Sequence, residues 1–283
     1  MPDDVQTRMQ IMGEIEDALG GGASVVVATV VNAGGLDLRA GAKLLVHRDG
    51  STVGGIDGAT VDEAVKAAAV EAYEAFPRLL SQTLWIHHEG GLTNRRSRSR
   101  PGDAQLMLEL FEAPARLLIV GGGHVGLAIA RIASIVGFSI AVLDDRQEFA
   151  NTERFPMADE VLCGDVAEIL DNARIDETTY VVLVSRGHLV DELALRHTVS
   201  RGAAYVGMIG SRRRTATVLQ HLRDDGVDAE GLARVHTPIG LDISAETPEE
   251  IALAILAEIV LVRKGGTGRV LSSMTRRGAA DSD

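Results

Sequence analysis

The chain has 283 residues, of which 46% are hydrophobic and 31 are glycine, a composition that suits a compact α/β protein of two domains. Its net charge of −12 at pH 7 and its aromatic content of 3% argue against nucleic acid as a partner, because they provide neither a basic surface nor a base-stacking platform. A single cysteine excludes an internal disulfide framework, and the lack of a secretory signal or of an apolar run of ~20 residues leads us to expect a cytoplasmic protein without a membrane span.

The first domain is predicted to be a small α/β domain over residues 1–113. Apolar residues at helical spacing predict an opening helix whose apolar stripe packs on the sheet that follows: Val5, Met9, Met12, Ile15 and Leu19. The other elements expected are strands over 25–31 and 42–47, a helix over 61–76, and strands over 84–87 and 104–111. Ala113 and Pro114 mark the domain boundary.

Three segments of this domain have the composition of binding segments. The loop over 32–41 contains three glycines and Arg39, and it is either a functional loop or a plain connector. Residues 54–58 lead into the predicted helix, whose open backbone amides could hold an anion. Residues 94–103 contain four arginines close together, which favours a solvated loop over a docking patch for an acidic partner or ligand.

A glycine motif opens the second domain, which we predict over residues 114–264. An apolar run over 117–120 predicts a buried parallel strand, and the Gly-x-Gly-x-x-Gly that follows it begins a helix, as in nucleotide-binding folds. The first glycine permits a tight turn, the second the approach of a pyrophosphate, and the third close packing of helix on strand. The motif predicts a mononucleotide or dinucleotide site, against the alternative of a Rossmann-type fold without a ligand, at Gly121, Gly122, Gly123, His124, Val125 and Gly126.

Two acidic residues follow the next predicted strand, over 139–143. Asp144 and Asp145 lie about 20 residues after the glycines, where a carboxylate would accept a hydrogen bond from a ribose hydroxyl. Asp144 favours NAD, with its free 2′-hydroxyl, whereas Arg146 could accommodate the 2′-phosphate of NADP.

The ends of two later strands contribute further candidate residues. The strand over 180–185 is followed by residues that should face the ligand crevice: Ser185, Arg186, His188 and Asp191. For His188 we rank a hydrogen bond to a ligand above general acid or base catalysis. The strand over 205–209 leads into Ser211, Arg212 and Arg213, which form either an anion site at a helix start or a solvated helix start without a ligand.

The remaining features concern folding. Cys163 ends a short apolar run and is predicted to be a buried, inert thiol. Thr247 and Glu250 predict a capping box at the start of the last helix, with Pro248 at its first position. Residues 265–283 are rich in glycine, serine and charge and are predicted to form a disordered tail.

Several segments in order resemble the XdhC/CoxI family of accessory proteins for molybdenum hydroxylases. Those that match the family's C-terminal domain are residues 121–126, 205–213, 238–243 and 246–252. A looser resemblance extends to the first domain, at residues 28–30, 41–46 and 49–50. The chain departs from the family within residues 57–62, where Thr60 replaces a cysteine and Asp62 a glutamate, so a cysteine at that turn cannot ligate molybdenum here.

The resemblance implies a Rossmann-like parallel sheet with helices on both faces, preceded by a smaller α/β domain. It implies a protein that binds molybdenum cofactor (molybdopterin) or a related nucleotide-bearing cofactor. Such a protein assists the sulfuration of the cofactor, with a cysteine desulfurase as a further partner, and its insertion into an apo molybdenum hydroxylase such as xanthine or carbon monoxide dehydrogenase. This role is closer to that of a chaperone than to that of a catalyst.

Two alternatives stay open at this point. The glycine motif and Asp144 also suit an NAD(P)-dependent oxidoreductase, although the chain has no obvious acid and base pair such as Tyr-x-x-x-Lys. A nucleotide-sensing regulatory protein is the second. We expect a homodimer only because symmetric dimers are common.

Overall fold

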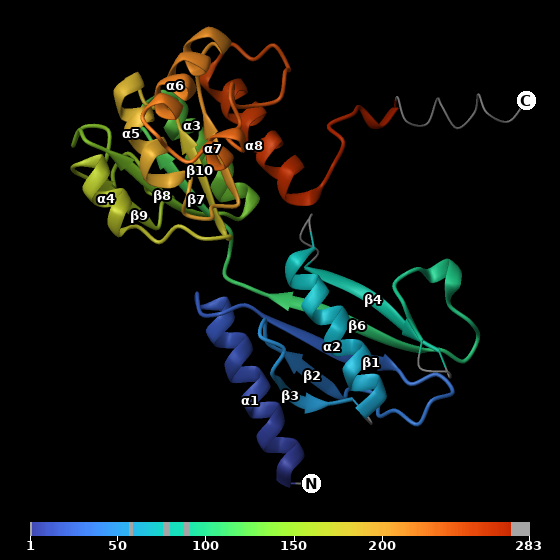
Figure 1. The fold of residues 1–283 in the computed structure, drawn as a ribbon. Coiled ribbons are helices and arrows are strands. Elements are labelled where there is room, and N and C mark those ends of the chain that lie inside the picture. Colours follow the sequence, from blue (N-terminus) through green and yellow to red (C-terminus); the bar gives the residue numbers. More distant parts are fainter. Residues whose placement is uncertain (1, 57–58, 76–79, 88–90, 273–283) are drawn as a thin grey trace, which may run out of the picture. The chain divides into compact units, whose positions relative to one another are not determined.

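The computed structural model describes residues 2–56, 59–75, 80–87 and 91–272. The chain divides into two compact units, Met1–Ala113 and Pro114–Asp283 (Figure 1). Within the described residues, no helix is long and apolar enough to cross a membrane. Each unit has its own sheet and its own hydrophobic core.

The N-terminal unit is an antiparallel sheet of strands in the order β3-β2-β1-β6-β4-β5, with two helices (Figure 1). The helices are α1 (Pro2–Leu19) and α2 (Ala59–Glu74). The strands are β1 (Val25–Asn32), β2 (Lys43–Val46), β3 (Thr52–Gly55), β4 (Ser81–Ile86), β5 (Leu92–Thr93) and β6 (Ala104–Phe111), and the short 3-10 helix η1 (Arg96–Arg98) lies before β6.

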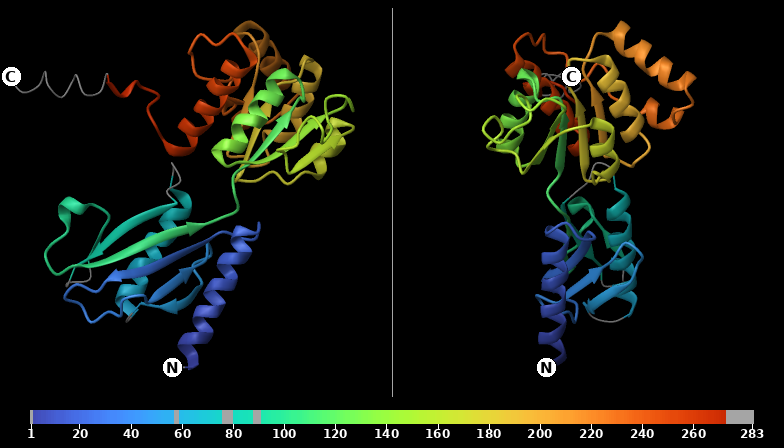
Figure 2. Two further views of the ribbon diagram at one scale, coloured as in Figure 1. Left: turned by 180° about the vertical axis from the view of Figure 1, so that it is seen from behind. Right: turned by 90° about the vertical axis from the view of Figure 1, so that its left-hand side faces the viewer.

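Alternation along β1 explains why both faces of this sheet are covered. Val26 and Ala28 pack in the core cluster of α2, whereas Val25 and Val27 pack in that of α1. Successive side chains of a strand point to opposite faces, so one apolar strand can serve two helices. The two helices lie on opposite sides of the sheet (Figure 2).

The predicted packing face of α1 is wrong. Ile11 and Ala18 are the buried residues of this helix, whereas four of the five predicted contacts are at least half exposed: Val5, Met9, Met12 and Leu19. Ile11, Ile15 and Ala18 also recur at helical spacing, and the small Ala18 allows close approach to the sheet. The helix therefore carries two apolar stripes, of which only one is covered in this unit.

The C-terminal unit is a parallel sheet in the order β11-β10-β7-β8-β9 with helices on both faces, which confirms the predicted fold class. Its strands are β7 (Arg116–Val120), β8 (Ser139–Asp144), β9 (Glu160–Cys163), β10 (Thr179–Leu183) and β11 (Tyr205–Met208). Its helices are α3 (His124–Val136), α4 (Val166–Asn172), α5 (His188–Thr198), α6 (Arg212–Asp224), α7 (Ala229–Ala233) and α8 (Pro248–Lys264).

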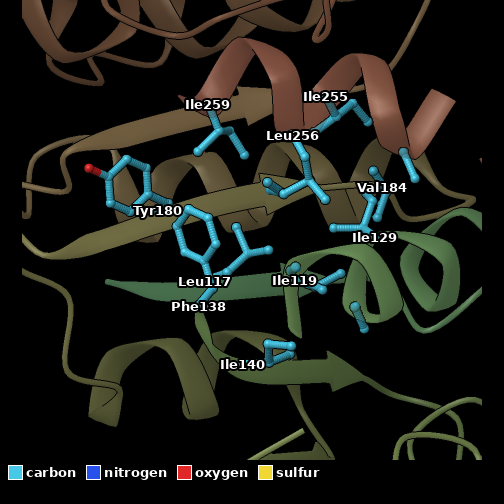
Figure 3. Packing of buried hydrophobic residues seen from close by; sticks show 14 of the residues in the cluster. Leu117, Ile119, Ile129, Phe138, Ile140, Tyr180, Val184, Ile255, Leu256 and Ile259 are labelled. Carbon is cyan, nitrogen blue, oxygen red and sulfur yellow. The ribbon is translucent and has the colours of Figure 1, made fainter. Parts of the chain in front are cut away.

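Apolar residues on both sides of the central strands hold the helices in place. Leu117 and Ile119 of β7 pack with α3 and α8, and Figure 3 shows them below Ile255 and Leu256. Leu118 packs with α4, α5 and α6 on the other face. Because β8 lies on one side of β7 and β10 on the other, the strand order reverses at β7, and a ligand crevice is expected at the carboxyl ends there.

The predicted capping box of α8 is confirmed. The Thr247 hydroxyl accepts a hydrogen bond from the Glu250 amide at 3.2 Å, and the Glu250 carboxylate accepts one from the Thr247 amide at 3.0 Å. Of the predicted tail, residues 266–270 have no regular structure, and residues 273–283 lie outside the described part of the chain.

Replacing Thr247 with alanine should lower the free energy of unfolding by about 1 kcal/mol, because the variant leaves an amide of the first helical turn without its acceptor. Urea denaturation followed by circular dichroism measures the change. The exposed Thr152, which lies in a turn, provides the control, and its alanine variant should stay within about 0.5 kcal/mol of the original protein. Equal stabilities of the two variants would contradict the role of the cap.

Candidate functional site

The glycine loop between β7 and α3 has the geometry that the motif predicts. Gly121 has a φ of +118°, and a Cβ there would lie 2.8 Å from the Ser185 amide nitrogen on the segment after β10. A Cβ on Gly126 would lie 2.0 Å from the Gly121 carbonyl oxygen, so only glycine allows α3 this close to the loop. A Cβ on Gly123 would meet nothing within 4 Å, which leaves open space at the start of the helix.

The N-terminus of α3 provides amides that can hold an anion. Gly123 is the N-cap, and since glycine has no side chain, it provides no side-chain cap to the first turn. His124 is exposed and Val125 is half-buried there. The helix dipole and the uncapped amide groups favour a negatively charged ligand at this point.

The Asp144 carboxylate is bound within the chain. It is only 4% exposed, and its Oδ2 accepts hydrogen bonds from the Gly122 amide at 2.8 Å and from Nη2 of Arg146 at 3.0 Å. Its Oδ1 accepts from the amide and from Nε of Arg146, at 3.1 Å and 2.9 Å. The carboxylate predicted to bind a ribose thus orders the glycine loop, and Asp145, with an exposed side chain, is the acid of the pair that faces solvent.

The contacts of Asp144 also keep it charged. Burial alone would raise the pKa of this carboxyl group, but the hydrogen bonds from Arg146 and from the Gly122 amide outweigh burial and hold the pKa below its usual value. Asp144 therefore provides a fixed negative charge rather than a proton at neutral pH.

Three arginines surround the ring of Phe149 in the segment that follows β8. The guanidinium carbons of Arg146, Arg154 and Arg186 lie 3.9, 5.4 and 6.0 Å from the ring centroid. Nε of Arg154 donates a hydrogen bond to the Gly122 carbonyl oxygen at 2.9 Å. Its Nη2 is buried and has no acceptor among the described residues, so an unsatisfied donor lies beside the glycine loop.

In this segment the sequence analysis singled out only Arg146 and missed Phe149 and Arg154. The available signal was a concentration of arginines next to an aromatic residue directly after the predicted ribose-binding acids. The three arginines offset the negative charge of the chain locally and make the carboxyl end of the sheet suitable for a phosphate.

The turn after β10 is ordered by its own side chains. The hydroxyl of Ser185 donates a hydrogen bond to Oδ1 of Asp191 at 2.6 Å and accepts one from the Gly187 amide at 3.3 Å. Asp191 is only 2% exposed, so it positions the turn and does not face the crevice as predicted. Arg186 is exposed, and α5 begins at His188, whose side chain lies outside the described part.

A cavity of about 180 Å³ lies at the carboxyl ends of β7, β8 and β10. The predicted site residues that line it are Gly121, Asp144, Asp145, Ser185 and Arg186. Arg146, Val166, Gly187 and Val190 complete its wall together with the ends of the strands. The charged groups of this lining are the guanidinium groups of Arg146 and Arg186 and the carboxylates of Asp144 and Asp145.

The other predicted site residues do not line this cavity. Ser211 caps α6 by accepting a hydrogen bond from the Arg214 amide at 3.3 Å, and Arg212 and Arg213 are exposed. They follow β11 at the edge of the sheet, next to β10. Gly122, Gly123, His124 and Val125 belong to the adjoining loop and helix start but not to the lining.

Cys163 is exposed, which makes the predicted buried thiol wrong. It is the last residue of the edge strand β9, paired in register with Asp144. An edge strand of four residues has a neighbour on one side only, so an apolar run there is not enough to bury its final residue.

A second polar cluster holds the segment before α8. Glu258 accepts hydrogen bonds from the Tyr205 hydroxyl at 2.9 Å and from the Gly240 amide, and its Oε1 lies 2.9 Å from Nδ1 of His236. The rings of Tyr205 and His236 stack with centroids 4.5 Å apart. Burial would raise the pKa of Glu258, but these partners hold it below its usual value, and burial beside this carboxylate raises the pKa of Tyr205.

Comparison with known families and proteins gives matches over both units. The profile described as XdhC Rossmann domain matches residues 117–259, which is half of the chain, and that of the XdhC and CoxI family matches residues 18–81. The chain is 33% identical to uncharacterized protein YqeB of Escherichia coli K12 over 250 residues, which are 87% of this chain and 44% of that protein.

Two further relatives have names that describe a function. The chain is 28% identical to a probable xanthine dehydrogenase subunit of Bacillus subtilis 168, over 56% of this chain and 46% of that protein. It is 24% identical to molybdenum cofactor insertion chaperone PaoD of E. coli K12, over 93% of this chain and 90% of that protein. The chain spans less than half the length of the first two of these three relatives.

A solved structure shares the fold. A crystal structure of a xanthine dehydrogenase from Bacillus halodurans superposes with a TM-score of 0.53 and 19% identity, covering 90% of this chain and 96% of that one. At this identity the likeness concerns the arrangement of helices and strands only.

Proposed function

Because the chain belongs to the XdhC and CoxI family, we propose that it binds molybdenum cofactor and assists its sulfuration and insertion into a molybdenum hydroxylase such as xanthine or carbon monoxide dehydrogenase. The relative named as a molybdenum cofactor insertion chaperone supports this role, since it aligns with this chain over nearly the full length of both. The relative named as part of a probable xanthine dehydrogenase supports a hydroxylase of that class as the client.

The observation that carries the proposal is the unsatisfied, positively charged edge of the glycine loop. The buried Nη2 of Arg154 has no acceptor among the described residues, and Gly123 leaves space before the uncapped start of α3. A phosphate at the start of α3 would accept hydrogen bonds from the amides of its first turn, and Arg186, which lines the cavity, would add positive charge. The phosphate of molybdopterin and the pyrophosphate of its dinucleotide form both meet this requirement.

In this proposal the residues of the chain bind and orient, and the client enzyme performs the catalysis. When bound, molybdenum cofactor would supply the molybdenum centre that the client enzyme uses. Asp144 fixes the glycine loop and Arg146 through hydrogen bonds, so the anion site is preorganised before the ligand arrives. Because its partners keep the Asp144 carboxylate charged, this residue orders the cavity and does not transfer a proton, which favours holding a cofactor over converting a substrate.

The oxidoreductase alternative is weakened by the contacts of Asp144. In an NAD-dependent enzyme a carboxylate at this position accepts a hydrogen bond from the ribose. Here each oxygen of the Asp144 carboxylate already accepts two hydrogen bonds. Oδ1 accepts both from Arg146, and Oδ2 accepts one from Gly122 and one from Arg146.

Three predictions from the sequence stay predictions: a nucleotide-sensing role, a cysteine desulfurase as the sulfur donor, and a homodimer.

To test the proposal, the full chain is produced in a host that makes molybdenum cofactor and is purified without oxygen. We expect bound molybdenum by mass spectrometry and bound pterin by fluorescence. Arg186→Ala should reduce both about tenfold or more, because a charge-assisted hydrogen bond contributes roughly 1.5–3 kcal/mol. Transfer of the bound cofactor to an apo hydroxylase then measures insertion.

Arg131→Ala is the matched control, because Arg131 is exposed on α3 and does not line the cavity. It should retain the cofactor. Absence of both molybdenum and pterin from the original protein would count against the proposal, as would tight binding of NADH or NADPH with hydride transfer.

A further inference from the structure

A second cavity, of about 410 Å³, lies in the N-terminal unit, beside the edge of the sheet formed by β2 and β3. Its wall comes from α1, from the loop before β2, from the start of β2 and from the end of β3. It shares no residue with the cavity at the glycine loop of the other unit.

Three cationic side chains from different segments line this cavity. Arg8 comes from α1, Arg39 from the loop before β2, and Lys43 from the first position of β2. The described lining contains no acidic residue, although the chain as a whole carries a net charge of −12. A concentration of positive charge against such a background focuses the electrostatic potential on a small volume and attracts anions.

Lys43 is held in place rather than extended into solvent. Its side chain is half-buried, and its Nζ donates a hydrogen bond to the Thr29 hydroxyl at 2.7 Å. An ammonium group has three donors, and this bond uses one of them. The lysine is therefore positioned before a ligand arrives, which lowers the entropic cost of binding.

Two of the glycines that line this cavity, Gly41 and Gly54, have a positive φ. Gly54 has a φ of +85°, and a Cβ there would lie 2.5 Å from the Lys43 carbonyl oxygen and within 3.4 Å of Ile11 and Thr7 on α1. A Cβ on Gly41, with a φ of +81°, would meet nothing within 4 Å. Both glycines have a positive φ that other residues rarely adopt, and a side chain at Gly54 would also press against β2 and α1.

A neighbouring carboxylate, that of Asp62, is held by its own chain. Its Oδ1 accepts a hydrogen bond from the Ile56 amide at 2.9 Å, and its Oδ2 would lie 3.1 Å from a Cβ on Gly55. The floor of the cavity is apolar, since Ile11 and Ala42 are 2% and 3% exposed. The cavity thus combines a charged rim with an apolar floor, as sites for small organic anions do.

We infer that this cavity binds the phosphate or pyrophosphate group of a small organic molecule. Arg39 and Lys43 contact the oxyanion, and Arg8 adds charge at the mouth. The loop containing Arg39 and the segment containing Gly54 and Gly55 were each singled out by the sequence, and the fold brings them to one cavity. The inference does not depend on molybdenum cofactor as the ligand of the other unit.

The test is isothermal titration of the full chain with inorganic pyrophosphate, in an Arg186→Ala background that weakens binding at the glycine loop. We expect one molecule bound per chain. Arg39→Gln and Lys43→Gln should each weaken binding about tenfold or more, since each removes a charge-assisted contact. Arg48→Gln, which removes an exposed arginine of the same unit outside the cavity, should leave binding unchanged.

Thermal denaturation of each variant accompanies the titration. Arg39 is exposed, so its variant should fold even if Lys43→Gln, which loses the bond to Thr29, is less stable. Absence of pyrophosphate binding in the Arg186→Ala background would overturn the inference. Equal weakening by Arg39→Gln and Arg48→Gln would also overturn it, because it would indicate general charge attraction. Cofactor loading of the Arg39→Gln variant is measured separately, so this inference and the proposed function can fail independently.

Discussion

Gly126→Ala should lower the free energy of unfolding of the C-terminal unit by about 3 kcal/mol, although alanine favours helices over glycine. The new Cβ would lie 2.0 Å from the Gly121 carbonyl oxygen, which is backbone and cannot rotate away. Relief of this contact requires α3 to move off the strand, and the glycine loop with it. Urea denaturation monitored by circular dichroism measures the loss.

Gly123→Ala provides a control at the same loop. Its Cβ would meet nothing within 4 Å, so we expect a stability loss of no more than about 1 kcal/mol, from the poorer N-cap. Its methyl group would, however, enter the space assigned to the phosphate and should reduce cofactor loading. Equal stability losses in the two variants would show that the approach of α3 to the loop does not depend on Gly126.

Glu258→Ala is expected to cost about 3 kcal/mol of unfolding free energy. The variant leaves three donors without their acceptor in a mostly buried site: the Tyr205 hydroxyl, the His236 ring and the Gly240 amide. Glu249→Ala, at an exposed position in the first turn of the same helix, should cost no more than about 0.5 kcal/mol. Equal losses would mean that the segment before α8 does not depend on this carboxylate.

The same residue predicts a dependence on pH. The folded state holds the pKa of Glu258 below its usual value of 4.5, so its contribution is complete above that pH. It is lost as the pH falls from about 4.5 through the lowered pKa of the folded state, because the unfolded chain takes up the proton first. Between pH 5 and pH 3 the free energy of unfolding, measured by urea denaturation, should therefore fall less for Glu258→Gln than for the original protein. If the free energy of unfolding of the variant depended on pH as steeply as that of the original protein, this assignment would be contradicted.

Local pattern was enough to predict most of the C-terminal unit. The strand over 117–120, the roles of Gly121 and Gly126, and the capping box at Thr247 all follow from residues close together in the chain, and the structure confirms them. These features depend on backbone geometry and short-range hydrogen bonds, which sequence determines directly.

The predictions from sequence fail where contacts between distant parts of the chain determine which residues are buried or paired. The two apolar stripes of α1 cannot be ranked without knowing the sheet they meet, and the burial of Ile11 over Met12 depends on that contact. The strand β3 (Thr52–Gly55) was not predicted, since it is short and half glycine, and only pairing with β2 makes it a strand. The partners of Asp144 depend on a turn that brings Arg146 back to it.

The enclosure of Asp144 by Gly122 and Arg146 also restricts how this site can change over evolutionary time. Loss of the carboxylate alone leaves the Gly122 amide and the Arg146 guanidinium without their acceptor. Loss of the arginine alone leaves the buried Asp144 carboxylate without the two hydrogen bonds that the guanidinium donates. Either single step costs stability before any new ligand preference can be gained. The residues at positions 144 and 146 should therefore be inherited together, and related chains that differ at one of them should differ at the other as well.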